Sequence, residues 1–281
     1  MDLSVIIVSW NVKDKLRANL NALLNSSGDF NLEIIVIDNH SQDGSPAMLR
    51  QEFPQIKLIS NQTNRGFAAA NNQGIKIAQG RFILLLNPDM KLEPSTLNNL
   101  LTWAQANPQA TVSSGKLLTE SGELIRHVRR FPTVLDQLAI IFKLPHLFPS
   151  INRRYLAQDF DYSQAAAVDS VRGAFFLINQ AAYQKISGQA KPYLDERYFI
   201  WFEEVDFCQA VYRQGGEVWY TPVAVAVDYV GQSFKQVKRP TTQRYFSQSM
   251  ISYFAKWRSP WETCLLKVSW RLVLLFLPKN K

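Results

Sequence analysis

The feature that most constrains the fold is an alternation of short apolar runs with helix-like segments over the N-terminal third of the chain. Residues 4–9 (Ser-Val-Ile-Ile-Val-Ser) predict a strand buried on both faces of a parallel sheet. Residues 11–25 follow with leucines at helical spacing. The alternation continues with strands predicted at 33–37, 57–60 and 81–86 and helices predicted at 45–53 and 66–79. This order predicts βαβ crossovers, and therefore an α/β fold with a mostly parallel, doubly wound sheet and helices on both faces.

The pattern changes after a predicted helix over 94–106. Apolar residues at 112–118 and 124–128, separated by Glu-Ser-Gly at 120–122, predict a β-hairpin. The remaining expectations are an amphipathic helix over 134–144, a mobile loop over 150–167 and a strand within 168–179.

Composition divides the chain into a main domain, residues 1–240, and a helical, basic and aromatic tail, residues 241–281. The longest apolar run of the tail, 272–277, falls far short of the roughly 20 residues that span a bilayer. With Trp257, Trp261 and Trp270 and interleaved cations, the tail either lies in a membrane interface or packs on the main domain. The sequence leaves both alternatives open.

Charge and cysteine content limit the environment and the partners. The 31 Lys and Arg against 23 Asp and Glu give a net charge of +8, which favours anionic partners. Cys208 and Cys264 lie far apart and predict neither a disulfide nor a zinc site. No signal-peptide pattern precedes the first strand, so a cytoplasmic protein is expected. Nucleic acid is not an expected partner, because the basic residues are scattered and no recognised motif is present.

Polar residues follow each of the four predicted N-terminal strands. They are Trp10-Asn11, the segment 38–44, the segment 61–66 and Asn87-Pro88-Asp89. Ligands of open α/β sheets bind at this carboxyl edge. Any single Asn or Asp there is compatible with turn or capping chemistry, but the joint pattern predicts a ligand site.

The phosphate-binding glycine loops GxGxxG and GxxxxGK[ST] are absent. A phosphate ligand would then need another counter-charge, and Asp89 at a buried strand end predicts Mg²⁺ or Mn²⁺ between carboxylate and diphosphate oxygens.

A second acidic group follows an aromatic run, Phe-Ile-Trp-Phe at 199–202. Glu203, Glu204 and Asp206 open a predicted helix, where acids also serve as simple capping residues. Carboxylates crowded in apolar surroundings have raised pKa values, which suits a general base for a hydroxyl group. These three acids are therefore the candidate catalytic residues.

Taken together, these motifs resemble those of the family 2 glycosyltransferases with the GT-A fold, especially the rhamnosyltransferase-like branch. The resemblance rests on the order and spacing of several segments: residues 4–11, 36–44, 64–71, 85–89, 172–174, 202–206 and Gly231-Gln-Ser233.

The resemblance implies a role for each matching position. Glu204 stands where the family usually has the Asp of its Glu-Asp pair, the general base, and Asp89 stands at the last acid of the DxD-like metal motif. A nucleoside-diphosphate sugar is the implied donor, and a glycan or lipid-linked hydroxyl is the implied acceptor. The implied donor-binding residues are Ser9, Asn11, Asp38, Asn39, Asp43, Asn64, Arg65, Gly66, Asn71, Asn87, Arg172 and Gly173.

One departure from the family pattern concerns the metal. Many relatives carry a His before the Gly-Gln-Ser segment, and Asp228 occupies that place here. A carboxylate is a competent ligand for Mg²⁺ or Mn²⁺, so Asp228 is the second candidate metal ligand.

Two other functions are alternatives to a glycosyltransferase. A nucleotidyltransferase would be expected to carry a glycine-rich basic loop after the first strand, which Trp10-Asn11-Val12-Lys13 is not. A catalytically silent nucleotide-sugar-binding or membrane-associated scaffold is the alternative of another class.

The basic excess suggests peripheral contact with anionic lipid at the inner face of the cell membrane. The candidate cations are Arg126, Arg129, Arg130, Lys235, Lys238, Arg239 and those of the tail.

Overall fold

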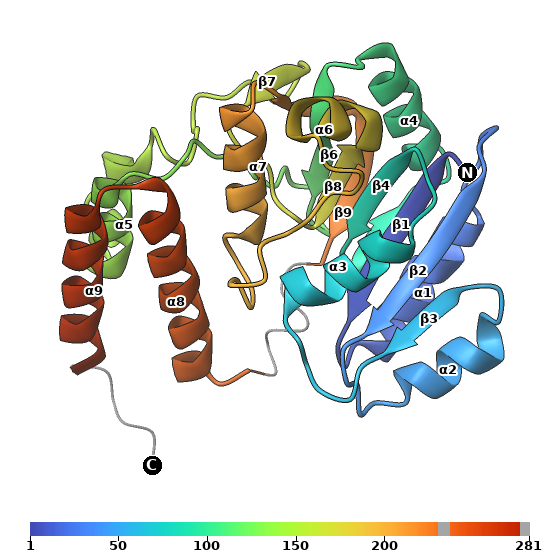
Figure 1. Ribbon diagram of the computed structural model, residues 1–281, viewed down its shortest axis with the longest axis horizontal. Helices are drawn as coiled ribbons and strands as arrows, with labels where there is room; N and C mark the ends of the chain where they lie inside the picture. The colour runs from blue at the N-terminus through green and yellow to red at the C-terminus, as the bar shows by residue number, and fades with distance from the viewer. Residues whose placement is uncertain (230–236, 276–281) are drawn as a thin grey trace.

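The computed structural model describes residues 1–229 and 237–275, and within them the chain forms a mixed sheet of nine strands covered by helices (Figure 1). The strands are β1 Leu3–Ser9, β2 Leu32–Asp38, β3 Lys57–Ser60, β4 Phe82–Leu86, β5 Met90–Leu92, β6 Ala110–Leu118, β7 Ala166–Val168, β8 Phe175–Asn179 and β9 Glu217–Asp228. The helices are α1 Lys13–Leu24, α2 Ser45–Glu52, α3 Phe67–Ile77, α4 Thr96–Ala106, α5 Val134–Ile141, α6 Gln180–Ser187, α7 Glu203–Arg213, α8 Arg239–Trp257 and α9 Pro260–Leu275. Two short 3₁₀ turns, η1 Leu144–His146 and η2 Pro149–Asn152, follow α5.

The strand order is β3-β2-β1-β4-β8-β6-β9-β5, with β7 paired to β9. Strands β3, β2, β1 and β4 are parallel to one another, and this is the half of the sheet that the alternation in the sequence predicts. Beyond β4 the sheet is mixed, because β8 is antiparallel to both β4 and β6. The predicted α/β class with a doubly wound sheet is confirmed.

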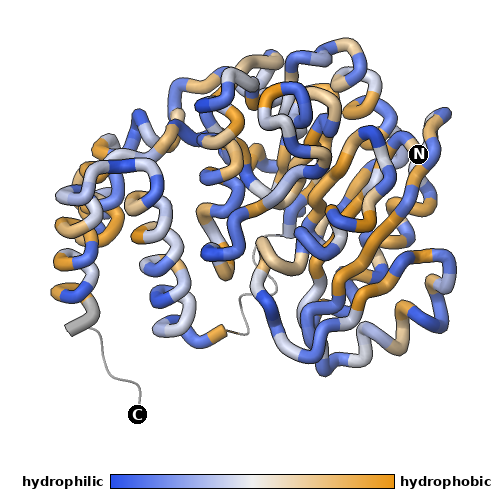
Figure 2. The backbone as a smooth tube through the Cα atoms, viewed as in Figure 1, coloured by the Kyte–Doolittle hydropathy of each residue, from blue (hydrophilic) through white to orange (hydrophobic). Residues whose placement is uncertain are grey.

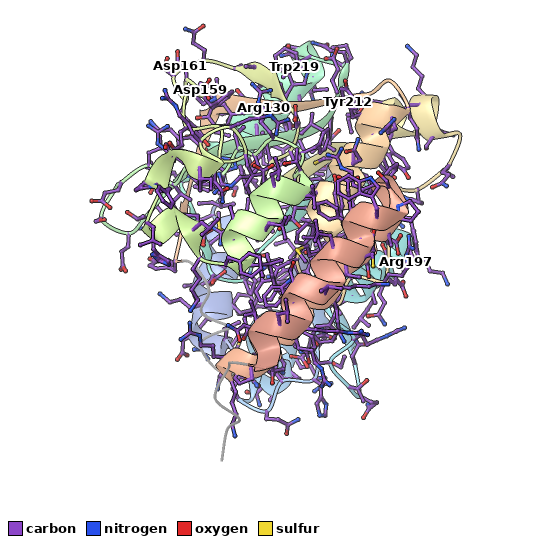
Figure 3. The ribbon with its side chains drawn as sticks, turned by 90° about the vertical axis from the view of Figure 1, so that its left-hand side faces the viewer. Arg130, Asp159, Asp161, Arg197, Tyr212 and Trp219 are labelled. Carbon is purple, nitrogen blue, oxygen red and sulfur yellow. The ribbon has the colours of Figure 1, made fainter. Side chains whose placement is uncertain are left out.

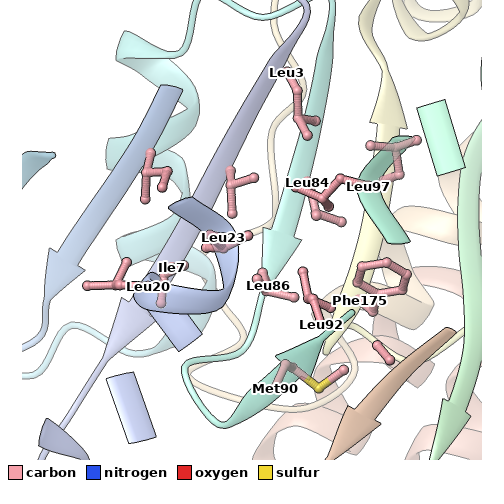
Figure 4. Packing of buried hydrophobic residues seen from close by; sticks show 14 of the residues in the cluster. Leu3, Ile7, Leu20, Leu23, Leu84, Leu86, Met90, Leu92, Leu97 and Phe175 are labelled. Carbon is pink, nitrogen blue, oxygen red and sulfur yellow. The ribbon is translucent and has the colours of Figure 1, made fainter. Parts of the chain in front are cut away.

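The central strands are apolar on both sides because helices cover both faces of the sheet. In β1, Val5 and Ile7 point into one buried cluster, and Ile6 points into the cluster on the opposite face. Figure 4 shows the first cluster, in which Leu20 and Leu23 of α1 lie over the strands. Figure 2 shows the strands as continuous hydrophobic segments of the backbone.

The predicted hairpin over 112–128 forms only around its turn. Residues 119–123 do form a turn, in which the Thr119 amide donates to the Glu123 carbonyl at 2.8 Å. An antiparallel bridge joins Leu118 to Leu124, and the Ile125 amide donates to the Leu117 carbonyl at 2.9 Å. Residues 125–128 form no strand, and β8 pairs with β6 at Val112 and Ser113 instead.

The predicted loop over 150–167 is irregular, as expected, but it is anchored to the core. The side chain of Tyr162 is 6% exposed, and its hydroxyl accepts a hydrogen bond from the Val128 amide at 2.8 Å.

The C-terminal helices pack on the main domain through a third buried cluster. Met250, Tyr253 and Phe254 of α8 and Trp270 of α9 meet Phe202, which precedes α7. Trp257 and Trp270 therefore fit the packing alternative, whereas Trp261 is 61% exposed. Among the described residues, no helix has the length and apolar character needed to cross a bilayer.

Candidate active site

A pocket of about 590 Å³ lies beyond the carboxyl ends of β1 and β4, at the edge where the sequence predicts a ligand site. It is closed on its other side by the segment before α7 and by the first turns of α8. Nine predicted residues line it: Asn39, Asn64, Gly66, Asn87, Asp89, Arg172, Gly173, Glu203 and Glu204. Eight others are not among its lining residues: Ser9, Asn11, Asp38, Asp43, Arg65, Asn71, Asp206 and Asp228.

Asn39 holds the loop before α3 against the end of β2. Its side-chain amide donates to Asn64 Oδ1 at 2.8 Å, and its Oδ1 accepts from the Arg65 backbone amide at 3.0 Å. The Asn64 Oδ1 also accepts from the Gly66 amide at 3.0 Å. The asparagines at this edge therefore shape the pocket wall as well as line it.

Ser9 and Asp38 are neighbours in the parallel ladder between β1 and β2, and both side chains are buried. Asp38 Oδ2 accepts from the Ser41 amide at 3.1 Å, whereas Asp38 Oδ1 and Ser9 Oγ have no hydrogen-bond partner among the described residues. Buried polar atoms are rarely left unpaired without a reason. These two atoms are unpaired at the β1–β2 edge, but both are buried and neither residue lines the pocket.

Asn11 and Asp43 connect the loops that follow β1 and β2. Asn11 Oδ1 accepts from the Gln42 amide at 2.7 Å, and Asp43 accepts from the Lys13 amide at 2.7 Å and from Ser45 Oγ at 2.6 Å. Burial by itself would raise the pKa of Asp43, but the hydrogen bonds from Ser45 and Lys13 lower it. The contacts of Asp43 in the structure are those of a capping residue at the starts of α1 and α2.

Gly66 is a position where only glycine fits. Its φ is +81°, and a Cβ there would lie 2.5 Å from the Phe199 carbonyl oxygen. The next amide, that of Phe67, donates to the same carbonyl at 2.6 Å. This contact joins the loop before α3 to the segment that carries Glu203 and Glu204.

We expect Gly66→Ala to lower the free energy of unfolding by about 2 kcal/mol or more and to weaken ligand binding in the pocket, because it adds a backbone clash to an unfavourable φ. Gly122→Ala is the matched control, since Gly122 has a φ of +83° but no atom within 4 Å of the added Cβ. Gly122→Ala should lower the free energy of unfolding by about 1 kcal/mol. Equal losses for the two variants, measured by urea unfolding, would contradict the role given to the Phe199 contact.

Glu203 and Glu204 begin α7 immediately after two strained residues. Trp201 and Phe202 have φ values of +63° and +69°, a left-handed conformation that costs free energy in bulky residues. Strain of this kind persists where the surrounding structure fixes it, and here the aromatic packing of Phe202 does so. The consequence is a sharp turn that directs the first turn of α7 at the pocket.

The two glutamates form a crowded pair. Glu203 is 4% exposed, whereas Glu204 retains some solvent contact at the pocket wall. The Oε2 atom of each has no hydrogen-bond partner in the described part of the chain. Burial and the neighbouring Glu204 raise the pKa of Glu203, and burial raises the pKa of Glu204 while Arg172 opposes the rise.

Asp206 differs from its prediction. Its carboxylate accepts from the Tyr198 hydroxyl at 3.0 Å, from Lys256 Nζ at 2.7 Å and from Trp257 Nε1 at 2.6 Å. Three donors thus surround a group that does not line the pocket. Its position on α7, one turn from Glu203, points it at α8 instead, which the sequence pattern did not reveal.

Asp89 and Asp228 come together although 138 positions separate them in the chain. Met90, next to Asp89, is the ladder partner of Asp228, and the Tyr229 amide donates to the Asp89 carbonyl at 3.3 Å. Both side chains are buried, and Arg172 forms an ion pair with Asp228 at 3.0 Å. No group of three or more potential metal ligands occurs among residues 1–229 and 237–275. Two carboxylates still fit Mg²⁺ or Mn²⁺, because diphosphate oxygens usually complete such a site.

The remaining predicted residues have local contacts. Asn71 donates to the Phe67 carbonyl inside α3 at 2.9 Å, and Arg65 touches Asn39 through its backbone. Gly173 lies beside Glu204, whose Cβ would be 3.4 Å from a Cβ at Gly173. The predicted segment Gly231-Gln-Ser233 and the cation Lys235 lie outside the described residues.

Several pocket residues were missed by the sequence reasoning. Phe199 and Tyr245 stack with centroids 4.4 Å apart, and Tyr245 belongs to α8, beyond the predicted domain boundary. Other lining residues that were not predicted include Phe67, Ile200, Trp201, Lys238 and Thr241. The aromatic run before the acids was the one local signal, and nothing local connects 238–245 to it.

Comparison with known proteins supports one family. The model described as "Glycosyl transferase family 2" matches residues 4–185, about two thirds of the chain. The hexosyltransferase Agl10 of low-salt glycan biosynthesis in Haloferax volcanii is 25% identical over 232 residues, which are 80% of this chain and 66% of Agl10. Rhamnosyltransferase WbbL of Escherichia coli is 27% identical over 239 residues, 80% of this chain and 82% of WbbL. This chain thus spans just under two thirds of Agl10.

A solved structure shares the fold. The mannosyltransferase PcManGT from Pyrobaculum calidifontis, in complex with GDP-Man and Mn²⁺, superposes with a TM-score of 0.59 at 17% identity, covering 98% of this chain and 70% of PcManGT. This likeness agrees with the predicted GT-A fold. The matched residues 4–185 contain the carboxyl edge of β1, β2 and β4, while Glu203 and Glu204 lie beyond them. On the extent of the family match, the chain belongs to the glycosyl transferase family 2 of enzymes.

Proposed function

We propose that this chain is an inverting glycosyltransferase that moves a sugar from a nucleoside-diphosphate donor to an acceptor hydroxyl. The observation that carries the proposal is Glu204, a carboxylate in the pocket wall with an unpaired oxygen and a raised pKa. A group of this kind can accept a proton from a hydroxyl near neutral pH.

In the proposed mechanism, Glu204 takes the proton of the acceptor hydroxyl, and the acceptor oxygen attacks the anomeric carbon. The bond from that carbon to the diphosphate breaks, and the configuration inverts. By the family resemblance, Asp38, with Ser9 beside it at the β1–β2 edge, would hold the nucleoside. Arg172, which lines the pocket, adds positive charge at its wall.

Asp89 and Asp228 are the residues that would hold Mg²⁺ or Mn²⁺, which when bound supplies positive charge to the departing diphosphate. The ion pair with Arg172 keeps Asp228 oriented toward the pocket side of β9.

The proposed donor and acceptor rest on analogy with the relatives. L-Rhamnose from dTDP-rhamnose is the proposed donor sugar, by analogy with WbbL and with an N-acetylglucosaminyl-diphospho-decaprenol L-rhamnosyltransferase of Mycobacterium tuberculosis. The proposed acceptor is a hydroxyl of a glycan or lipid-linked intermediate in polysaccharide synthesis. Such an acceptor would place the chain in the cytoplasm, peripherally on the inner face of the membrane. A catalytically silent nucleotide-sugar binder is the second candidate.

A donor screen tests this proposal. We expect one nucleoside-diphosphate sugar to raise the melting temperature, and the rise to require Mg²⁺ or Mn²⁺. Asp228→Ala should weaken that metal dependence at unchanged fold. Stabilisation by a donor without release of nucleoside diphosphate, in the presence of acceptor extracts, would favour the silent binder. No response to any donor with either metal would refute nucleotide-sugar binding altogether.

A further inference from the structure

Helix α9 exposes an apolar stripe to solvent. Trp261, Leu265, Val268 and Leu272 are 61%, 39%, 48% and 48% exposed. Their spacing of four, three and four residues places them on one face of the helix. The opposite side carries Leu266 and Trp270, which are buried against α8 and α5. The side chains of the stripe therefore remain exposed although the other face of α9 packs on the protein.

A second exposed apolar group lies on α5 and in residues 142–152, which follow α5 and contain the two 3₁₀ turns. Leu135, Leu147 and Phe148 are 73%, 74% and 60% exposed, and Phe142 and Ile151 are 46% and 44% exposed. The sequence predicts an amphipathic helix over 134–144 with Leu135 and Phe142 on its apolar face, and the structure leaves both side chains exposed.

The two groups belong to one side of the molecule. Helices α5 and α9 pack against each other, and Figure 3, which looks onto this side, shows them next to each other. Nine of the fifteen exposed large hydrophobic side chains in the described chain lie on α5, on α9 or in residues 142–152 directly after α5. Isolated exposed hydrophobic residues are normal, but a cluster marks an interaction surface. We name these nine residues the α5–α9 surface.

The exposed charges on the α5–α9 surface are mainly positive. Of the nearby acids, Asp136 is buried, and Glu262 is half-buried and accepts hydrogen bonds from Ser259. The exposed Asp159 lies beyond segment 137–158, which like segment 263–273 contains no Asp or Glu. The exposed charged residues of these two segments are Lys143, Arg153, Arg154, Lys267 and Arg271. On α9, Lys267 and Arg271 lie along one side of the apolar stripe, and basic residues beside an apolar helix face are typical of helices that lie in a membrane interface. A second copy of the chain would bring two such cationic rims together, which opposes a symmetric dimer.

We propose that the α5–α9 surface docks the protein on an anionic lipid bilayer, with its apolar residues at the acyl boundary and its cations among the lipid phosphates. This inference extends the proposed acceptor class, because it names the face that meets the membrane. The surface is built from α5, residues 142–152 and α9 together and excludes Lys238, which lines the pocket.

The arrangement of α8 and α9 relates this surface to the pocket. The two helices are antiparallel, so the end of α9 lies beside the start of α8 (Figure 1). Contact between the Phe246 and Trp270 rings, 6.3 Å apart, fixes that alignment. Tyr245, next to Phe246, lines the pocket. The apolar stripe therefore runs toward the end of the molecule where a lipid-linked acceptor would enter.

Vesicle binding tests the proposal without turnover. We expect the full chain to sediment with phosphatidylglycerol-containing vesicles and much less with pure phosphatidylcholine vesicles. Leu147→Ser with Phe148→Ser, and separately Val268→Ser with Leu272→Ser, should each weaken binding about tenfold or more. The matched control is Tyr193→Ser with Val223→Ser, which removes two exposed hydrophobic side chains outside this surface and should bind like the parent.

Two further arms separate the sources of binding. Lys267→Gln with Arg271→Gln should reduce the preference for anionic lipid and its sensitivity to salt. Brominated lipids should quench the fluorescence of the parent more than that of Trp261→Phe, because the other tryptophans are buried or half-buried.

Equal vesicle binding by the parent and both serine pairs would overturn the proposal. So would a concentration-dependent dimer that the serine pairs abolish, since the surface would then meet a second copy. Failure of the donor screen would leave the vesicle result intact, and the two proposals therefore fail separately.

Discussion

Glu204→Gln should abolish sugar transfer while leaving the fold and donor binding in place. The amide keeps the size of the side chain but cannot accept a proton, and loss of a general base lowers kcat by about 10²–10⁴-fold. Because burial raises the pKa of Glu204, the ionised form is lost at a higher pH than in an exposed glutamate. We therefore expect kcat/KM of the parent to rise with pH until that pKa is passed, as measured by nucleoside diphosphate release in steady state.

Glu203→Gln is the matched control for this experiment. Glu203 is the more buried of the two glutamates, and its pKa is raised in the folded protein. The free energy of unfolding therefore falls as the pH rises through that pKa and the buried carboxyl group ionises. Above the folded pKa, Glu203→Gln should be at least as stable as the parent and should keep most of its kcat. If Glu203→Gln lost activity and Glu204→Gln kept it, the base would have been assigned to the wrong residue.

Asp206→Ala should lower the free energy of unfolding by about 3 kcal/mol or more relative to the parent. The substitution removes the acceptor shared by Tyr198, Lys256 and Trp257, and it leaves these donors partly buried without their partner. The Lys256 side chain is 27% exposed and also pairs with Asp195 at 3.1 Å. The loss in free energy of unfolding should therefore lie at the low end of the range found when a buried ion pair loses one partner. Urea unfolding followed by far-UV circular dichroism measures this loss.

Asp195→Asn is the control, because it weakens the exposed pair with Arg197 and one contact of Lys256. It should cost about 1 kcal/mol or less. A catalytic role for Asp206, as the sequence pattern suggested, would instead give an Asp206→Ala protein of normal stability without turnover.

Much of the fold was predictable because it is encoded by local periodicity. The β1 to β4 half of the sheet is parallel and buried on both faces, so each strand is a continuous apolar run and each crossover is an amphipathic helix. The C-terminal half was harder to predict. Strand β8 lies between β4 and β6 in the sheet, although neither of these strands comes directly before or after β8 in the chain. No turn motif in the sequence indicates this pairing.

The candidate site divides in the same way. Four pocket residues could be predicted from the strand ends alone, because parallel strands bring their carboxyl ends to one edge of the sheet. They are Asn39, Asn64, Asn87 and Asp89. Arg172 and Gly173 required the family resemblance. The stacked pair of Phe199 and Tyr245 could not be predicted, since contacts between distant segments leave no periodic trace in the sequence.

The sequence by itself determined the α/β class, the ligand-binding edge and the acidic character of the start of α7. Those features depend on neighbouring residues and on strand direction alone. Only the tertiary structure decided how three nearby acids differ: Glu203 and Glu204 face the pocket, while Asp206 anchors α8. The same packing decided which apolar residues of α5 and α9 remain in solvent, because burial depends on the helices that reach each face.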